Sequence, residues 1–204
     1  IAVNLLPLAG ALFWGWKIFD ILLLYWVENV IIGVLNVFKF CAFFQRKKLW
    51  IAFPIVPFFI FHYGMFCLGH GVFVLLIFGL QLTVGEEGPP FEDGLQVALD
   101  VLQDPMFMLA AAGLVASHTF SFIVNFIGKG EVDRLTLPAL MNAPYGRVVA
   151  LHITILLGGG LALALGEPIW ALALLTLIKT AGDLRAHRKS HAKLAAAQSN
   201  TRNQ

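Results

Sequence analysis

Residues 61–70 read Phe61-His62-Tyr63-Gly64-Met65-Phe66-Cys67-Leu68-Gly69-His70, and they lie inside an apolar run that extends from Ile51 to Leu80. At 1.5 Å of rise per residue, a helix of this length crosses the hydrocarbon core of a bilayer, which is about 30 Å thick. Two histidines at such a depth are costly unless each has a polar partner. The stretch therefore predicts a membrane helix, and it directs the search for a site to polar groups on neighbouring helices.

The composition indicates a polytopic α-helical membrane protein. Of the 204 residues, 59% are hydrophobic and 13% are charged, and the mean hydropathy is +0.81. A soluble domain would carry about 25% charged residues. Cys41 and Cys67 both fall in apolar runs, which argues against a disulfide framework. The chain begins at Ile1 rather than Met, so we expect the first residues of the protein to be missing.

The apolar runs predict an all-α bundle of six transmembrane helices within residues 1–184, followed by a basic cytoplasmic tail at 185–204. The six spans cover residues 1–14, 18–44, 51–80, 106–127, 144–165 and 169–183. The pattern contains no visible internal repeat of the kind that marks an inverted-repeat transporter.

A short amphipathic helix is expected between spans three and four. Residues 81–105 carry six acidic side chains and no Lys or Arg. Within them Phe91, Leu95, Ala98 and Leu102 recur at helical spacing, opposite a polar face. This pattern predicts a helix over 91–103 that lies flat on the outer surface, with the Phe91/Leu95/Leu102 edge towards the bilayer or the mouth of the bundle.

The distribution of Lys and Arg predicts that both termini are cytoplasmic. Lys17 stands alone on one side of the predicted membrane, while Lys39 and Lys179 lie near the other surface. That other side collects eleven basic residues, namely Arg46, Lys47, Lys48, Lys129, Arg134, Arg147, Arg185, Arg188, Lys189, Lys193 and Arg202. Because basic loops stay on the cytoplasmic side, the acidic segment should face outward, and we expect a multi-pass protein of a prokaryotic inner membrane.

Polar residues recur on one face of each span, and their depths define candidate sites. Glu28 and His70 each lie about ten residues from the outer ends of their spans, so we expect them to pair directly or through one water or ion. His62, His118 and His152 can share a layer in the inner half of the bilayer, where they are candidate ligands of a metal.

Several of these residues also have simpler interpretations. A membrane histidine commonly does no more than hydrogen-bond a neighbouring helix. Lys179 and Asp183 have the spacing of a local ion pair near a helix end. Glu28 is harder to explain by packing, because an acidic residue at mid-depth costs about 2.5–3.5 kcal/mol on insertion scales.

At four sets of residues the chain resembles an uncharacterised family of prokaryotic integral membrane proteins, known as a domain of unknown function. The sets are Tyr25-Trp26-x-Glu28-Asn29, His62-Tyr63-Gly64 with His70, Pro144-Tyr145-Gly146-Arg147 with His152, and Lys179-Thr180 with Asp183 and His187. The resemblance covers most of spans two to six. It implies a membrane protein, and it supplies no activity or cofactor.

Four functions remain open at this point. The first is a buried His/Glu site that binds a transition metal or a haem- or chlorophyll-type cofactor. The second is a proton- or ion-coupled transporter that titrates Glu28 and His70. The third is an accessory subunit of a larger membrane complex. The fourth is a serine hydrolase that uses Ser117 or Ser121 with His152, although the sequence contains no GxSxG elbow. No pattern indicates binding to nucleic acid, and whether the protein is an enzyme stays open.

Overall fold

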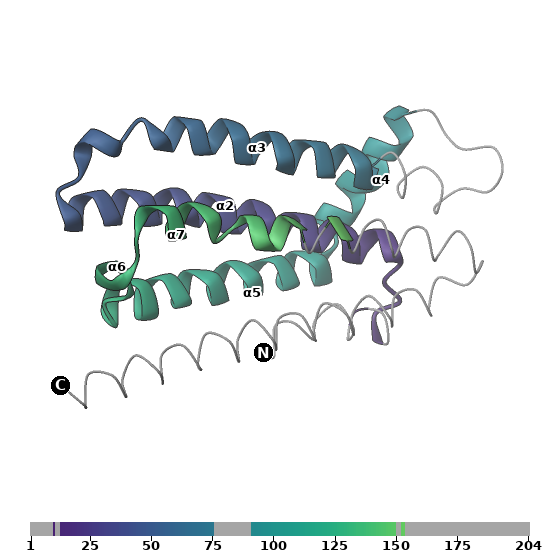
Figure 1. The fold of residues 1–204 in the computed structure, drawn as a ribbon. Coiled ribbons are helices and arrows are strands. Elements are labelled where there is room, and N and C mark those ends of the chain that lie inside the picture. The colour runs from purple at the N-terminus through teal and green to yellow at the C-terminus, as the bar shows by residue number, and fades with distance from the viewer. Residues whose placement is uncertain (1–9, 11–12, 76–90, 150–151, 154–204) are drawn as a thin grey trace.

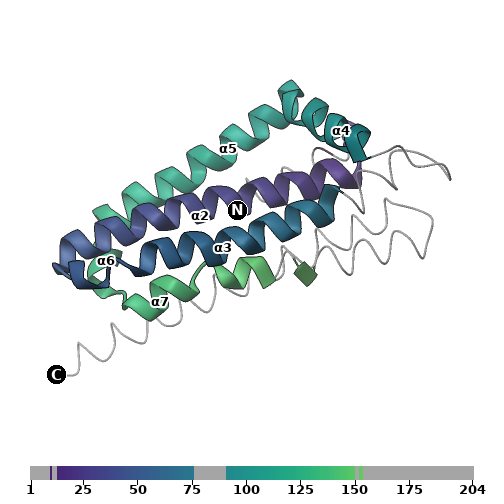
Figure 2. The same cartoon turned by 90° about the horizontal axis from the view of Figure 1, so that it is seen from above.

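The structure is a computed structural model that describes residue 10 and residues 13–75, 91–149 and 152–153 (Figure 1). This part of the chain is all α. Helix α2 spans Ile18–Lys47 and lies between α3 (Ile55–Phe73) and α5 (Pro105–Ser121), as the two views in Figures 1 and 2 agree. The two helices that flank α2 make its most extensive contacts, so α2 is the central helix of the described bundle.

Helix α2 has defined signals at both ends. The Asp20 carboxylate accepts a hydrogen bond from the backbone N–H of Lys17 at 2.7 Å, which satisfies one of the free N–H groups at the start of the helix. At the other end Lys48 adopts a left-handed conformation with φ 53°, and its N–H bonds back to the Phe44 carbonyl. The chain then reverses through the short helix η2 (Trp50–Ala52) into α3.

The amphipathic helix predicted between spans three and four is confirmed. Helix α4 spans Phe91–Gln103, and α5 begins two residues later behind Asp104, whose carboxylate caps the Phe107 N–H at 2.8 Å. Ala98 is buried against the bundle, while Leu95 and Leu102 are exposed. The side chain of Phe91 lies outside the described residues.

The segment between the fourth and fifth predicted spans is partly helical. Helix α5 continues as the π-helical segment η4 (Phe122–Gly128), and the chain then forms α6 (Glu131–Arg134) and α7 (Leu137–Asn142). Leu140 of α7 is buried, and its carbonyl accepts a hydrogen bond from Asn36 at 3.4 Å. The segment therefore turns back along α2 rather than remaining outside the bundle, because α7 has an apolar side chain to bury.

Three described helices are long and apolar enough to cross a membrane. They are Phe19–Lys47, Trp50–Phe73 and Pro105–Gly128. These correspond to the second, third and fourth predicted spans. The first, fifth and sixth predicted spans lie mostly or wholly outside the described residues, as does the tail at 185–204.

Two apolar clusters hold the bundle together, and polar residues of α2 lie between them. One cluster gathers around the first turns of α2 and includes Phe19, Leu22 and Leu24 with Phe107 of α5. The other gathers around the last turns and includes Phe40, Phe44, Phe59 and Phe126. The three buried polar or charged residues of the described chain are Glu28, Asn29 and Asn36, which fall between these clusters along α2.

Candidate functional site

Glu28 is the centre of the candidate site. Its side chain is only 6% exposed, and one carboxylate oxygen, Oε1, lies 3.2 Å from Nε2 of His118 and 3.3 Å from Nη1 of Arg147. The imidazole belongs to α5 and the guanidinium to the helical residues 145–149, so three separate segments meet at one oxygen. We call these three residues the Glu28 cluster.

Exposure differs strongly within the Glu28 cluster. The His118 side chain is 21% exposed and the Arg147 side chain is 48% exposed, compared with 6% for Glu28. A buried carboxylate is stable in its charged form only where opposite charge or hydrogen-bond donors compensate for lost hydration. Arg147 supplies a permanent positive charge and His118 supplies a donor, so the cluster provides both.

Three residues of one short stretch, Tyr145, Arg147 and His152, each contact a polar residue of α2 or α3. Tyr145 contacts His62, Arg147 contacts Glu28, and His152 contacts His70. The chain is helical at 145–149 and again at 152–153. One short stretch of sequence therefore carries a partner for three of the polar residues predicted as site residues.

The His70–His152 contact has a defined hydrogen-bond direction when both rings are neutral. Nδ1 of His70 lies 2.7 Å from the Phe66 carbonyl oxygen, and a carbonyl only accepts, so Nδ1 carries the proton. Nε2 of His70 is then an acceptor. It lies 3.1 Å from Nδ1 of His152, which must therefore donate. The outer nitrogen of His152, Nε2, consequently carries a lone pair that can take up a proton.

His62 lies in an aromatic environment on α3. Its Nδ1 is 2.7 Å from the hydroxyl of Tyr145, and either group can donate in this bond. The ring of Phe58 stacks on the imidazole at a centroid distance of 5.4 Å, and Phe66 approaches it edge-on at 5.2 Å. His62 is nonetheless exposed at the surface of the bundle.

Two hydrogen bonds from side chains to backbone tie α3 to α2 beside the site. Trp26 Nε1 donates to the Cys67 carbonyl at 2.7 Å, and the Tyr63 hydroxyl donates to the Asn29 carbonyl at 3.0 Å. Gly33 permits the second contact, since a Cβ at this position would stand 2.5 Å from Cε1 of the Tyr63 ring. Close packing of α2 on α3 thus fixes the depth of the polar groups on both helices.

The described contacts of Glu28 and His70 are with other residues, and their expected pairing, directly or through one water or ion, stays a prediction. Glu28 contacts His118 and Arg147, and both ring nitrogens of His70 are occupied, by the Phe66 carbonyl and by His152. The predicted depths of Glu28 and His70 were compatible with a pair. Equal depth does not determine whether two side chains on different helices point towards each other. The predicted local pair Lys179 and Asp183 lies outside the described residues.

The three histidines expected to share a metal contact different partners. His62 pairs with Tyr145, His118 with Glu28, and His152 with His70. Among the described residues, no three or more His, Cys, Asp or Glu side chains are grouped so that they could hold a metal ion. Both cysteines are free, as their positions in apolar runs predicted. Ser121 accepts a hydrogen bond from Asn125 at 3.2 Å, and none of the described contacts joins it to His152.

Arg147 is the site residue that the sequence analysis did not assign. We counted it with the basic cytoplasmic side, yet its guanidinium lies on Glu28, which is roughly 28 Å along α2 from Lys47 at 1.5 Å per residue. The available signal was its position five residues before His152, near the start of a predicted span. A cation in such a place is costly unless an intramembrane carboxylate faces it.

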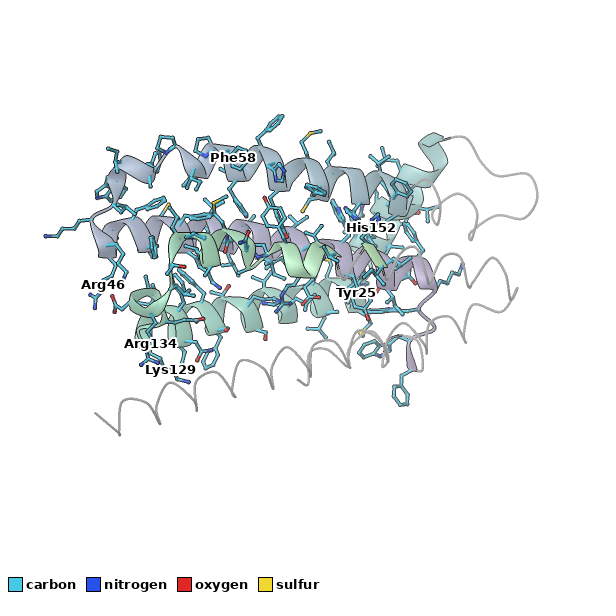
Figure 3. The ribbon with its side chains drawn as sticks, viewed as in Figure 1. Tyr25, Arg46, Phe58, Lys129, Arg134 and His152 are labelled. Atoms are coloured by element: carbon cyan, nitrogen blue, oxygen red, sulfur yellow. The ribbon has the colours of Figure 1, made fainter. Side chains whose placement is uncertain are left out.

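A second ion pair lies at the end of the bundle where α2 finishes. Arg46 donates from Nε and Nη2 to both carboxylate oxygens of Asp133 at 3.0 and 3.2 Å, and Lys47 Nζ donates to the Asp133 carbonyl at 2.6 Å. The hydrogen bond from Arg46 and its positive charge hold the pKa of Asp133 below its usual value. Arg46, Lys129 and Arg134 gather at this end in Figure 3, which we call the basic end.

Comparison with known proteins identifies a family and no function. No curated protein and no solved structure is significantly similar to the chain. A family described as "Family of unknown function (DUF6498)" matches residues 1–200, which is nearly the whole chain. The chain therefore belongs to this family of unknown function, in agreement with the resemblance seen in its polar motifs.

Proposed function

We propose that the protein is a multi-pass membrane protein that translocates protons through the Glu28 cluster. The observation that carries the proposal is the buried Glu28 carboxylate, shared at 3.2 and 3.3 Å by an imidazole and a guanidinium from two other segments. Ionisable residues within membrane helices are rare, and they commonly mark ion pathways and proton relays.

The charges of the Glu28 cluster favour His118 as the group that takes up the proton. Arg147 stays protonated and keeps Glu28 ionised, so the two charges cancel. Nε2 of His118 donates to the carboxylate, which leaves Nδ1 of the neutral ring as the proton acceptor. In this proposal, a proton taken up at Nδ1 of His118 changes the net charge of the three side chains of the Glu28 cluster from zero to plus one.

The His70–His152 pair is the second station of the proposed route. His152 lies five residues after Arg147 in the same stretch of chain, and its Nε2 can accept a proton while Nδ1 passes one to His70. A second additional proton would place like charges 3.1 Å apart, so the pair carries at most one additional proton in this proposal. Because Nδ1 of His70 donates to the Phe66 carbonyl, the pair takes up and releases its single proton at Nε2 of His152.

The proposed orientation places the basic end in the cytoplasm and α4 outside. Arg46, Lys129 and Arg134 support this orientation because they gather at one end (Figure 3), while α4 lies at the opposite end. We retain six spans with both termini in the cytoplasm as part of the proposal.

Proton flux into liposomes tests the proposed function. Purified protein is reconstituted with an internal pH dye, and potassium with valinomycin supplies the driving potential. We expect proton uptake above that of protein-free liposomes, and we expect it to be abolished in Glu28→Gln. Asp20→Asn is the matched control, because Asp20 is a carboxylate on the same helix that caps its first turn. Wild-type flux equal to that of protein-free liposomes would contradict the proposal.

Cysteine labelling tests the proposed orientation. Cys41 and Cys67 are first replaced by Ala, and single cysteines are then placed at the exposed positions Gln96 of α4 and Lys48 of the basic end. An impermeant maleimide should label Gln96→Cys in intact cells and should label Lys48→Cys only after the cells are opened. The reverse labelling pattern would contradict the proposed orientation and support the opposite one.

A further inference from the structure

His62 occupies a position that a membrane helix tolerates poorly. It lies twelve residues after Trp50 and eleven before Phe73 in a helix long enough to span a membrane, so about 17 Å of helix separates it from either end. The residue is exposed at the surface of the bundle. Its Nδ1 bonds to the Tyr145 hydroxyl, while Nε2 has no hydrogen-bond partner among the described residues. A polar nitrogen that faces hydrocarbon without a partner costs free energy.

We propose that the exposed face of His62 binds the ring of a lipid-soluble quinone. His62 is exposed in the middle of a helix long enough to span a membrane, so a partner that reaches Nε2 from outside the bundle comes from the hydrocarbon phase. A quinone meets this requirement, since it dissolves in the membrane and presents a polar carbonyl on a planar ring. This binding is independent of proton translocation by the Glu28 cluster.

The His62–Tyr145 hydrogen bond suits both the quinone and the quinol form. When the Tyr145 hydroxyl donates to Nδ1, the neutral imidazole carries its proton on Nε2 and can donate to a quinone carbonyl. When Nδ1 donates to the tyrosine oxygen, Nε2 becomes an acceptor and can receive the hydroxyl of a quinol. A fixed donor such as Trp, or a fixed cation such as Lys, could donate to either form but could not accept the hydroxyl proton of the quinol.

Aromatic rings beside His62 provide the apolar part of the proposed site. Phe58 lies one turn before His62 and Phe66 one turn after it, and their side chains are 51% and 43% exposed (Phe58 is labelled in Figure 3). Both rings already contact the imidazole. Their exposed surfaces can extend the stack over a bound ring, because aromatic pairs favour offset or edge-on contact at 4.5–7 Å.

Calorimetric titration of the purified full chain in detergent with decyl-ubiquinone tests the proposal. Decylbenzene, which has the same tail and no carbonyl, measures simple partition into the micelle. We expect saturable binding of the quinone and about tenfold weaker binding in His62→Phe, which keeps an aromatic ring and loses the nitrogen. Tyr145→Phe should weaken quinone binding about threefold, because the His62 imidazole keeps both nitrogens and loses only the tyrosine hydroxyl that orients its proton.

Phe61→Leu is the matched control. Phe61 is an exposed aromatic residue on α3 next to His62 in sequence, on a different face of the helix. Its substitution should leave quinone affinity unchanged. If His62→Phe does not fold, His62→Gln and Tyr145→Phe replace it. The glutamine amide retains a donor and an acceptor, so it should bind the quinone more tightly than a His62→Leu variant does.

Three results would overturn the proposal. They are quinone binding no tighter than decylbenzene partition, equal quinone affinity in the wild type and His62→Phe, and crosslinking of a photoreactive group at Phe58 to another polypeptide in native membranes. The last result would mean that a protein subunit covers this face of α3.

Discussion

The Glu28 cluster and the Arg46–Asp133 pair use the same chemistry in opposite surroundings. Both join a guanidinium to a carboxylate and both tie α2 to a later segment of the chain. Glu28 is 6% exposed, whereas the Arg46 and Asp133 side chains are 65% and 43% exposed. Exposed ion pairs contribute little because water and salt screen them, while a charge buried without its partner is strongly destabilising. The comparison predicts that loss of the charge at Glu28 costs more stability than loss of the charge at Asp133.

The largest expected effect is that of Glu28→Gln on stability. The amide keeps the shape of the side chain but removes the charge that faces Arg147, so we expect a loss of about 3 kcal/mol. This is the lower end of the range for broken buried pairs, because Arg147 is half exposed and water compensates part of the loss. Denaturation in detergent measures it. Asp133→Asn at the basic end should have a much smaller effect, because this ion pair is exposed to water and salt. Equal losses at the two sites would remove the distinction between the two regions.

Gly33→Ala should disturb the neighbourhood of the Glu28 cluster without changing any charge. A Cβ at Gly33 would stand 2.5 Å from the Tyr63 ring, so the ring must move and its hydrogen bond to the Asn29 carbonyl must weaken. Overpacking of this kind costs about 1–3 kcal/mol. Gly64→Ala is the control, because a Cβ there meets no atom within 4 Å. A destabilised Gly64→Ala with an unaffected Gly33→Ala would show that α2 and α3 pack differently.

A double-mutant cycle should show that Glu28 and Arg147 act together. Loss of both charges leaves neither one unpaired, so Glu28→Gln with Arg147→Gln should be more stable than the sum of the two single losses predicts. We expect a coupling energy of about 1 kcal/mol from thermal unfolding of the four proteins. The same cycle on Asp133→Asn and Arg46→Gln should give additive losses. Additive losses in the Glu28 and Arg147 cycle as well would mean that the two side chains contribute to stability independently.

The smallest expected effect is the pH dependence of the basic end. The pKa of Asp133 is lower in the folded chain than its usual value near 4, because Arg46 donates to the carboxylate. A lowered folded pKa stabilises the fold above about pH 4, and this contribution is lost as the pH falls through the folded pKa. Any advantage of the wild type over Asp133→Asn should therefore disappear in acid and shrink in high salt. An advantage that does not decline as the pH is lowered below about 4 would exclude this cause.

Local properties of the chain determined the class of protein and several elements. Runs of apolar residues predicted three helices of membrane-spanning length, observed at Phe19–Lys47, Trp50–Phe73 and Pro105–Gly128. The spacing of Phe91, Leu95, Ala98 and Leu102 predicted α4 with its observed bounds. Hydropathy and helical periodicity are read within a window of about twenty residues, so sequence alone carries them. The sequence also identified the residues that would need polar partners, above all Glu28. A polar side chain at the middle of a membrane helix costs free energy whichever way the helix is rotated.

The choice of partners was decided only by the tertiary structure. Sequence assigned Glu28 and His70 a common depth, but the structure rotates Glu28 towards His118 and Arg147, and His70 towards His152. Arg147 reaches Glu28 because α7 buries Leu140 against α2 and so carries the following residues back along the bundle. Depth follows from counting residues along one helix, whereas a contact depends on the rotation of two helices and on the path of the chain between them. Those quantities are set by packing between residues far apart in the sequence, such as Tyr63 against Gly33.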